Sequence, residues 1–138
     1  MEKLTDIYRE LHDKGVLMFS RALSFSSGSR AACIEMNGSY GLFVDITQLS
    51  SLADETVVVA HEAGHISTGS THALSSPYDL IQRHEYRADK WAIKKLIPKD
   101  ELEEAMSQGY TEPWDLAERF EVTEEFIKKA VAYYYPER

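Results

Sequence analysis

The segment 57–65 constrains this chain more than any other, because it carries the pattern His-Glu-x-x-His after a nonpolar run. At 3.6 residues per turn, His61 and His65 lie one turn apart on one face of a helix, so both imidazoles can bind one Zn²⁺. Glu62, about 100° around that helix, borders the same space as a potential general base. The preceding valines share the histidine face, which predicts that the rings point inward. The alternative is a pair of buried histidines hydrogen-bonded to backbone.

A second helix is predicted between Ser76 and Pro98. Ser76 is followed by proline at the first helical position and by Asp79 at the third, which is typical of a capped helix start. The nonpolar stripe of this helix also contains Glu85 and Asp89, four residues apart. Two carboxylates on a buried face repel each other and lose hydration unless a cation or a hydrogen-bonded partner compensates.

We therefore predict one Zn²⁺ per chain, with Glu85 as the third protein ligand beside His61 and His65. Asp89 is predicted to accept a hydrogen bond from a liganding histidine, His61 in our interpretation, and to fix its orientation. The fourth position stays open for water. The alternative is a solvated helix face whose acids pair with neighbouring basic side chains.

Such a site suits metal-assisted peptide hydrolysis. Zn²⁺ lowers the pKa of water toward ~7 and polarises a carbonyl, while Glu62 takes the proton and delivers it to the leaving amine. The developing oxyanion needs a second donor besides the metal. Candidates are His72, Tyr78, His84, Tyr86 and Arg87. His72, in a loop, and Tyr78, near the helix start, are preferred, because periodicity places His84 and Tyr86 off the Glu85 face.

Together, His61-Glu62-Ala63-Gly64-His65 and Glu85-x-x-Ala88-Asp89-x-Trp91-Ala92 resemble the ImmA/IrrE family of small zinc metallopeptidases. The Glu-x-x-x-Asp part is also similar to the thermolysin-like gluzincins. The resemblance runs from about residue 31 to the C-terminus. Ala63 departs from it, since a larger aliphatic residue is more usual there, which should affect packing only. The resemblance implies a cytosolic, site-specific endopeptidase of prophages, mobile elements or stress regulons that cuts a helix-turn-helix repressor.

A competing zinc pattern is that of the metzincins, His-Glu-x-x-His-x-x-Gly-x-x-His. Here Gly69 and His72 follow the motif with one residue too many between His65 and the glycine. The next methionine, Met106, lies in a charged helical segment and makes no obvious methionine turn. We therefore interpret His72 as a loop histidine near the mouth of the site.

The N-terminal third predicts a helix and a β-hairpin. Nonpolar residues recur at helical spacing over 3–13, which ends at Gly15, whereas the segment 16–30 has no clear pattern. Asn37-Gly38 between the strands 31–36 and 40–46 is a strong signal for an antiparallel hairpin. Because extended substrates can add to a sheet edge, this hairpin is either a substrate shelf or a purely structural element.

The C-terminal part predicts a lobe of short helices after Pro98. Segments 113–120 and 123–132, with a turn between them, are typical of a helix-turn-helix. A DNA-binding unit needs a basic face, yet residues 110–138 hold 4 Lys and Arg against 7 Asp and Glu, a net charge of −3. We interpret these helices as a lobe packed on the core or a surface that recognises the substrate, without direct nucleic-acid binding.

The composition indicates which partners and which cellular compartment to expect for the protein. The formal charge of −8 and pI near 5.1 disfavour binding to nucleic acid or anionic membranes. The single Cys33 cannot form an internal disulfide and indicates a reducing compartment. The chain shows no signal peptide and no nonpolar run of the ~18 residues that a membrane span needs. The expected location is the cytoplasm.

We predict an α+β fold with two parts. Residues 1–98 form a mostly helical, zincin-like metallopeptidase core with a small antiparallel hairpin or sheet, and residues 99–138 form a C-terminal helical lobe packed on it. The predicted function is a zinc endopeptidase acting on a protein substrate. Two alternatives remain open: a non-catalytic module with a structural zinc, in which His72 or His84 would be the fourth ligand, and an acidic helix-turn-helix regulator.

Overall fold

The computed structural model describes residues 2–21, 30–69 and 78–136, and within them six α-helices and a small sheet. The helices are α1 (Glu2–Asp13), α2 (Leu52–Thr68), α3 (Tyr78–Leu96), α4 (Lys99–Ser107), α5 (Pro113–Phe120) and α6 (Glu124–Tyr134). The strands are β1 (Leu17–Arg21), β2 (Ala31–Met36) and β3 (Ser39–Asp45), followed by the short 3₁₀ helix η1 (Ile46–Gln48). The α+β, mostly helical prediction is confirmed.

The sheet has the order β1-β3-β2, so β2 is an edge strand. The predicted hairpin is present: β2 pairs antiparallel with β3, and Asn37 and Gly38 both adopt positive φ in the turn. Strand β1 was not predicted, and it pairs parallel with β3 on the other side. The sheet is therefore mixed rather than purely antiparallel.

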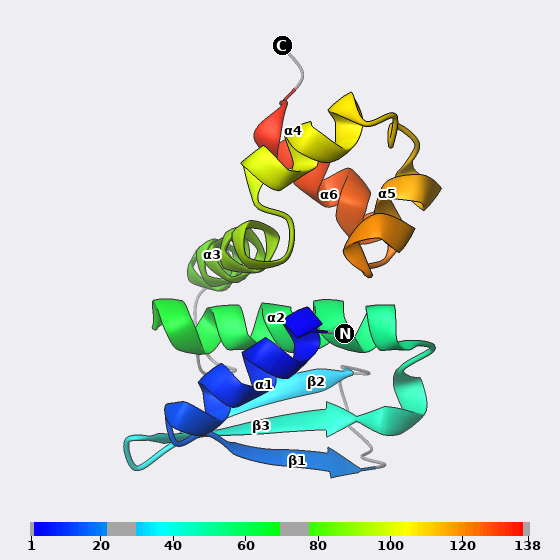
Figure 1. Cartoon of the computed structure of the whole chain (residues 1–138). Helices are drawn as coiled ribbons and strands as arrows, with labels where there is room; N and C mark the ends of the chain where they lie inside the picture. The colour runs from blue at the N-terminus through cyan, green and yellow to red at the C-terminus, as the bar shows by residue number, and fades with distance from the viewer. Residues whose placement is uncertain (1, 22–29, 70–77, 137–138) are drawn as a thin grey trace.

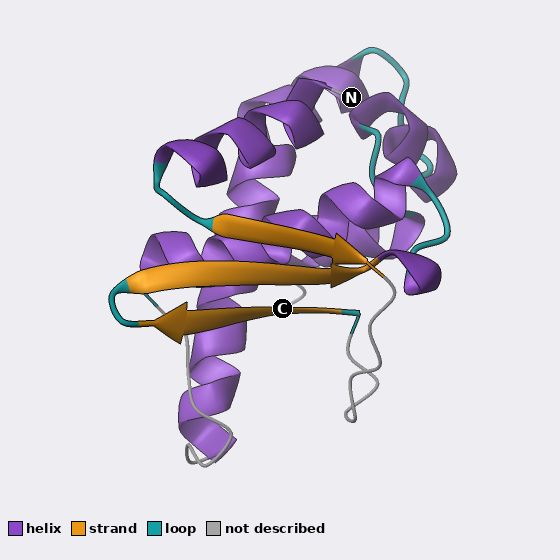
Figure 2. Ribbon diagram, turned by 90° about the horizontal axis from the view of Figure 1, so that it is seen from below, coloured by secondary structure: helices purple, strands orange, loops and turns teal. Residues whose placement is uncertain are grey.

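The described helices lie on one face of the sheet (Figure 1), and the view from below shows the strands in front of them (Figure 2). Helix α2 runs along the sheet, and α1 and α3 pack beside it. The buried residues form one cluster that extends from α1 through β3, α2 and α3 into α5 and α6. None of the described helices has the length and apolar character needed to cross a membrane.

Local sequence signals explain where α2 begins and ends. The Ser51 hydroxyl accepts a hydrogen bond from the Asp54 amide at 3.1 Å, which caps the first turn. At the other end Gly69 adopts the left-handed conformation with φ of 64°, and its amide bonds back to the last turn. The helix between these two ends therefore contains the whole His-Glu-x-x-His motif.

Gly64 allows α2 and α3 to approach until their backbones touch. A Cβ placed on Gly64 would lie 2.6 Å from the carbonyl oxygen and 2.9 Å from the Cα of Ala88. Both neighbouring atoms belong to backbone, so a side chain at this position would force the helices apart. Because α2 carries the two motif histidines and α3 carries Glu85, this contact sets the separation of the predicted ligands.

We expect Gly64→Ala to destabilise the metal-free protein by about 1–3 kcal/mol, because a rigid backbone cannot accept the added methyl group. A glycine-to-alanine change at an open helical position would instead stabilise by about 1 kcal/mol, so the two cases differ in sign. Urea unfolding of both proteins measures the difference. An increase in the free energy of unfolding would contradict the close approach.

Candidate metal centre

The two motif histidines project from one side of α2, one turn apart. Their ring centroids are 4.9 Å apart and their planes are nearly perpendicular, at 85°. His65 is buried, with 4% of its surface exposed, whereas the side chain of His61 is 24% exposed. The inward orientation predicted from the helical arc is therefore present, with His61 nearer to the open side.

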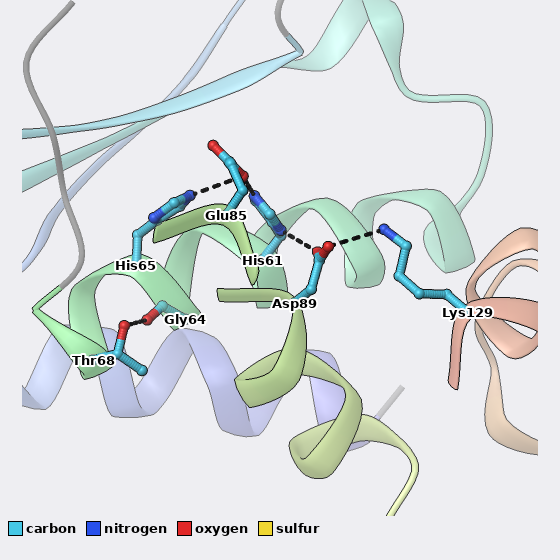
Figure 3. A network of polar contacts seen from close by, with 7 residues as sticks. All are labelled: His61, Gly64, His65, Thr68, Glu85, Asp89 and Lys129. Atoms are coloured by element: carbon cyan, nitrogen blue, oxygen red, sulfur yellow. Dashed lines mark hydrogen bonds and ion pairs between the residues drawn. The ribbon is translucent and has the colours of Figure 1, made fainter. Parts of the chain in front are cut away.

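Helix α3 brings Glu85 to both imidazoles. Its Oε2 lies 2.6 Å from His61 Nε2 and 3.3 Å from His65 Nε2 (Figure 3). One donor atom from each residue can be chosen so that all three lie within 4.8 Å of one another. Among the residues that the structure describes, His84 does not join this group. The sequence prediction that Glu85 meets the histidine pair agrees with these distances.

Asp89, one turn after Glu85, holds the other nitrogen of His61. The distance from His61 Nδ1 to Asp89 Oδ1 is 2.8 Å. Ionised carboxylates only accept hydrogen bonds, so both ring nitrogens of His61 donate and the ring is an imidazolium in this arrangement. Burial lowers the pKa of His61, but the hydrogen bonds to Asp89 and Glu85 outweigh it and raise this pKa to about 10.

The Nε2 proton of His61, which is donated to Glu85, occupies the position that a cation can take. The hydrogen bonds from His61 and His65 hold the pKa of the Glu85 carboxyl well below its ordinary value. The Nε2 proton of His61 therefore offsets part of the negative charge of the acids. A divalent cation bound at the same nitrogen would displace this proton, which couples metal binding to proton release.

Glu62 borders the same space from α2, and it contacts the sheet. Burial raises the pKa of Glu62, and the thiol of Cys33 on β2 forms a hydrogen bond with its carboxylate. Burial and the neighbouring Glu62 charge raise the pKa of the Cys33 thiol to about 12, so the thiol stays protonated and donates. This contact was not predicted, because β2 and α2 are joined by no local pattern.

A groove passes the site. One cavity of about 460 Å³ and an adjoining one of about 600 Å³ share four lining residues, so they form one continuous groove. The shared residues are Arg30, Val57, Phe126 and Lys129. Its inner end contains His61, Glu62, Glu85 and Asp89. Among the described residues, the walls of the groove therefore come from β2, α2, α3 and α6.

A second unpredicted contact comes from the C-terminal lobe. Lys129 of α6 places its Nζ 3.3 Å from Asp89 Oδ2 (Figure 3). Asp89 is thus engaged on both oxygens, by His61 on one side and by Lys129 on the other. Sequence reasoning missed this ion pair because the partners are 40 residues apart and no spacing rule connects them.

The predicted oxyanion donors are placed only in part. His72 lies outside the described residues, and so does the side chain of Tyr78, although its backbone begins α3. Tyr86 is 58% exposed, in agreement with its predicted position off the Glu85 face, whereas His84 is half-buried, and Arg87 is exposed.

The chemistry of the donor set fits a divalent metal. Two imidazole nitrogens and one carboxylate oxygen converge, a fourth side faces the groove, and a carboxylate holds the outer nitrogen of one histidine. Three protein ligands with an open position are typical of catalytic zinc sites, and a histidine oriented by an acid is their usual support.

Comparison with known proteins agrees with this chemistry. The family model described as the IrrE N-terminal-like domain, Peptidase_M78, matches residues 24–131. Searches of curated proteins and of solved structures gave no significant match. The matched segment spans well over half of the chain and includes both motifs, so the resemblance seen in the sequence is confirmed. The chain belongs to the ImmA/IrrE family of metallopeptidases.

Proposed function

We propose that this metallopeptidase is a zinc-dependent endopeptidase with His61, His65 and Glu85 as metal ligands and Glu62 as the general base. The observation that carries the proposal is the convergence of three donor atoms within 4.8 Å beside the half-buried carboxylate of Glu62. Zinc is favoured over magnesium or calcium because two of the donors are imidazole nitrogens. Asp89 is the residue that orients His61.

The ion, when bound, supplies Lewis acidity that activates water and polarises the scissile carbonyl. Glu62 accepts the proton of the attacking water and passes it to the nitrogen of the leaving amine. Burial raises the pKa of Glu62, which suits a group that must first take and then release a proton near neutral pH. The Cys33 thiol lies beside the Glu62 carboxylate on the side of the sheet.

The edge strand β2 is the proposed substrate shelf. Among the described strands, β2 pairs only with β3, so its other edge can accept an extended peptide by strand addition. Ala31, at its start, lines the groove together with Arg30. Arg30 binds both carboxylate oxygens of Asp54, at 2.7 and 2.6 Å, and so ties the start of the strand to the first turn of α2. A peptide on this edge would cross the metal centre.

The proposed substrate is a helix-turn-helix repressor in the cytoplasm, and this assignment comes from the family resemblance. The net charge of this chain, −8, supports recognition of the repressor itself rather than of the DNA that the repressor binds. Residues 1–98 would form the peptidase core, and residues 99–138 would form the lobe that contributes the outer groove wall. Phe126 and Lys129 of α6 line the groove, which supports a role of the lobe in binding substrate.

We expect Glu85→Ala to lose most of the bound zinc, because removal of one ligand leaves a two-histidine site with weak affinity. His72→Ala should keep one zinc per chain. Elemental analysis of both purified variants beside the unmodified protein measures the stoichiometry. Loss of zinc with His72→Ala and retention with Glu85→Ala would replace our ligand assignment by the alternative histidine.

We expect Glu62→Gln to retain zinc and to lose cleavage by a factor of about 10²–10⁴, because an amide cannot accept the proton of water. Co-expression with the repressor encoded next to the protein, followed by a search for one discrete cut, measures the activity. Glu104→Gln, an exposed change on α4 away from the groove, is the matched control and should cleave normally. Full proteolysis by Glu62→Gln would refute its role as the base.

A further inference from the structure

We propose that Lys129 of α6 is a positioning residue for the metal centre and acts through Asp89. The inference rests on the proposed function, because the chain of contacts ends at a histidine assigned as a metal ligand. Lys129 Nζ lies 3.3 Å from Asp89 Oδ2, and Asp89 Oδ1 lies 2.8 Å from His61 Nδ1. The C-terminal lobe is thereby linked to the metal site by two consecutive hydrogen bonds.

The contact matters because Asp89 is anchored from two sides. Its side chain is 29% exposed, so without a second partner the carboxylate can rotate and exchange the His61 contact for water. Lys129 engages one oxygen and leaves the other to His61, which fixes the carboxylate plane. A fixed acceptor keeps the proton on Nδ1 and leaves Nε2 as the donor atom for a metal.

The ordinary interpretation is a surface ion pair of little consequence. The Lys129 side chain is 53% exposed, and exposed pairs contribute about 0.2–1 kcal/mol to stability. Two features separate this pair from that class. Its acid is shared with His61, and Lys129 itself lines the groove at the metal centre. Its effect should therefore fall on metal binding more than on folding.

Two physical effects of Lys129 oppose each other in sign. Its charge repels a bound cation, so a purely electrostatic lysine would weaken metal binding and its removal would tighten it. Its hydrogen bond orients Asp89, so a positioning lysine would strengthen metal binding and its removal would loosen it. The direction of change in zinc affinity therefore distinguishes the two roles.

The test is zinc affinity, measured by competition with a chromogenic chelator on the full chain. Lys129→Met keeps the aliphatic stem and removes the ammonium group, and it should weaken zinc binding about three- to tenfold. Lys129→Arg keeps a donor at that place and should restore affinity to within about twofold. Lys128→Met, an exposed lysine on the same helix, removes the same charge and should leave affinity unchanged. The visible spectrum of the Co²⁺ form should change in Lys129→Met only.

A double-mutant cycle shows whether the effect passes through Asp89. In the background of Asp89→Asn, Lys129→Met should cause no further loss of affinity, since the partner charge is already gone. Unchanged or tighter zinc binding in Lys129→Met, or an equal loss in Lys128→Met, would overturn the positioning role while leaving the proposed function intact. A parent protein that binds no zinc would overturn both. Matching thermal unfolding of the metal-free variants would establish that the chain remains folded.

Discussion

The backbone contact between α2 and α3 at Gly64 and Ala88 is the constraint on which the site depends. Two helices with ordinary side chains between them have axes 8–10 Å apart, and here a missing Cβ removes one layer of atoms. The approach lets Glu85 reach both imidazoles from the neighbouring helix, at 2.6 and 3.3 Å. The ligand geometry is thus a result of packing in the core, one turn away from the groove.

Charge is the second factor that organises the site, because the metal centre has three acidic side chains and only two histidines. Glu62, Glu85 and Asp89 surround two histidines, and the protein satisfies them through His61 protonated on both nitrogens, the Cys33 thiol and one lysine from the lobe. On the proposed ligand assignment, a proton and a metal ion would compete for Nε2 of His61. The hydrogen bonds that Glu85 and Asp89 accept from the two histidines and from Lys129 are the physical reason that both acids can lie in the nonpolar stripe of α3.

Much of this arrangement could be predicted from local patterns. Helical spacing placed the histidines on one face, the acids four residues apart pointed to a shared cation, and Asn37-Gly38 predicted the hairpin. Strand β1 escaped prediction because its five residues carry no turn signal toward β3, and their pairing is parallel and long-range. The Cys33 and Lys129 contacts escaped for the same reason: each joins elements whose proximity is decided by tertiary packing. Only the family resemblance pointed to a repressor, and no spacing rule could.

The residues of the metal centre lie far apart in the sequence, which affects when the site can form during synthesis. Helix α2 leaves the ribosome with its histidine pair, but Glu85 follows 20 residues after His65, and the wall formed by Phe126 comes later still. A nascent chain that ends before Glu85 consequently has an incomplete set of donor atoms, and its groove lacks the wall formed by α6. On the proposed ligand assignment, the complete metal centre can therefore form only after α3 has been synthesised and has packed against α2.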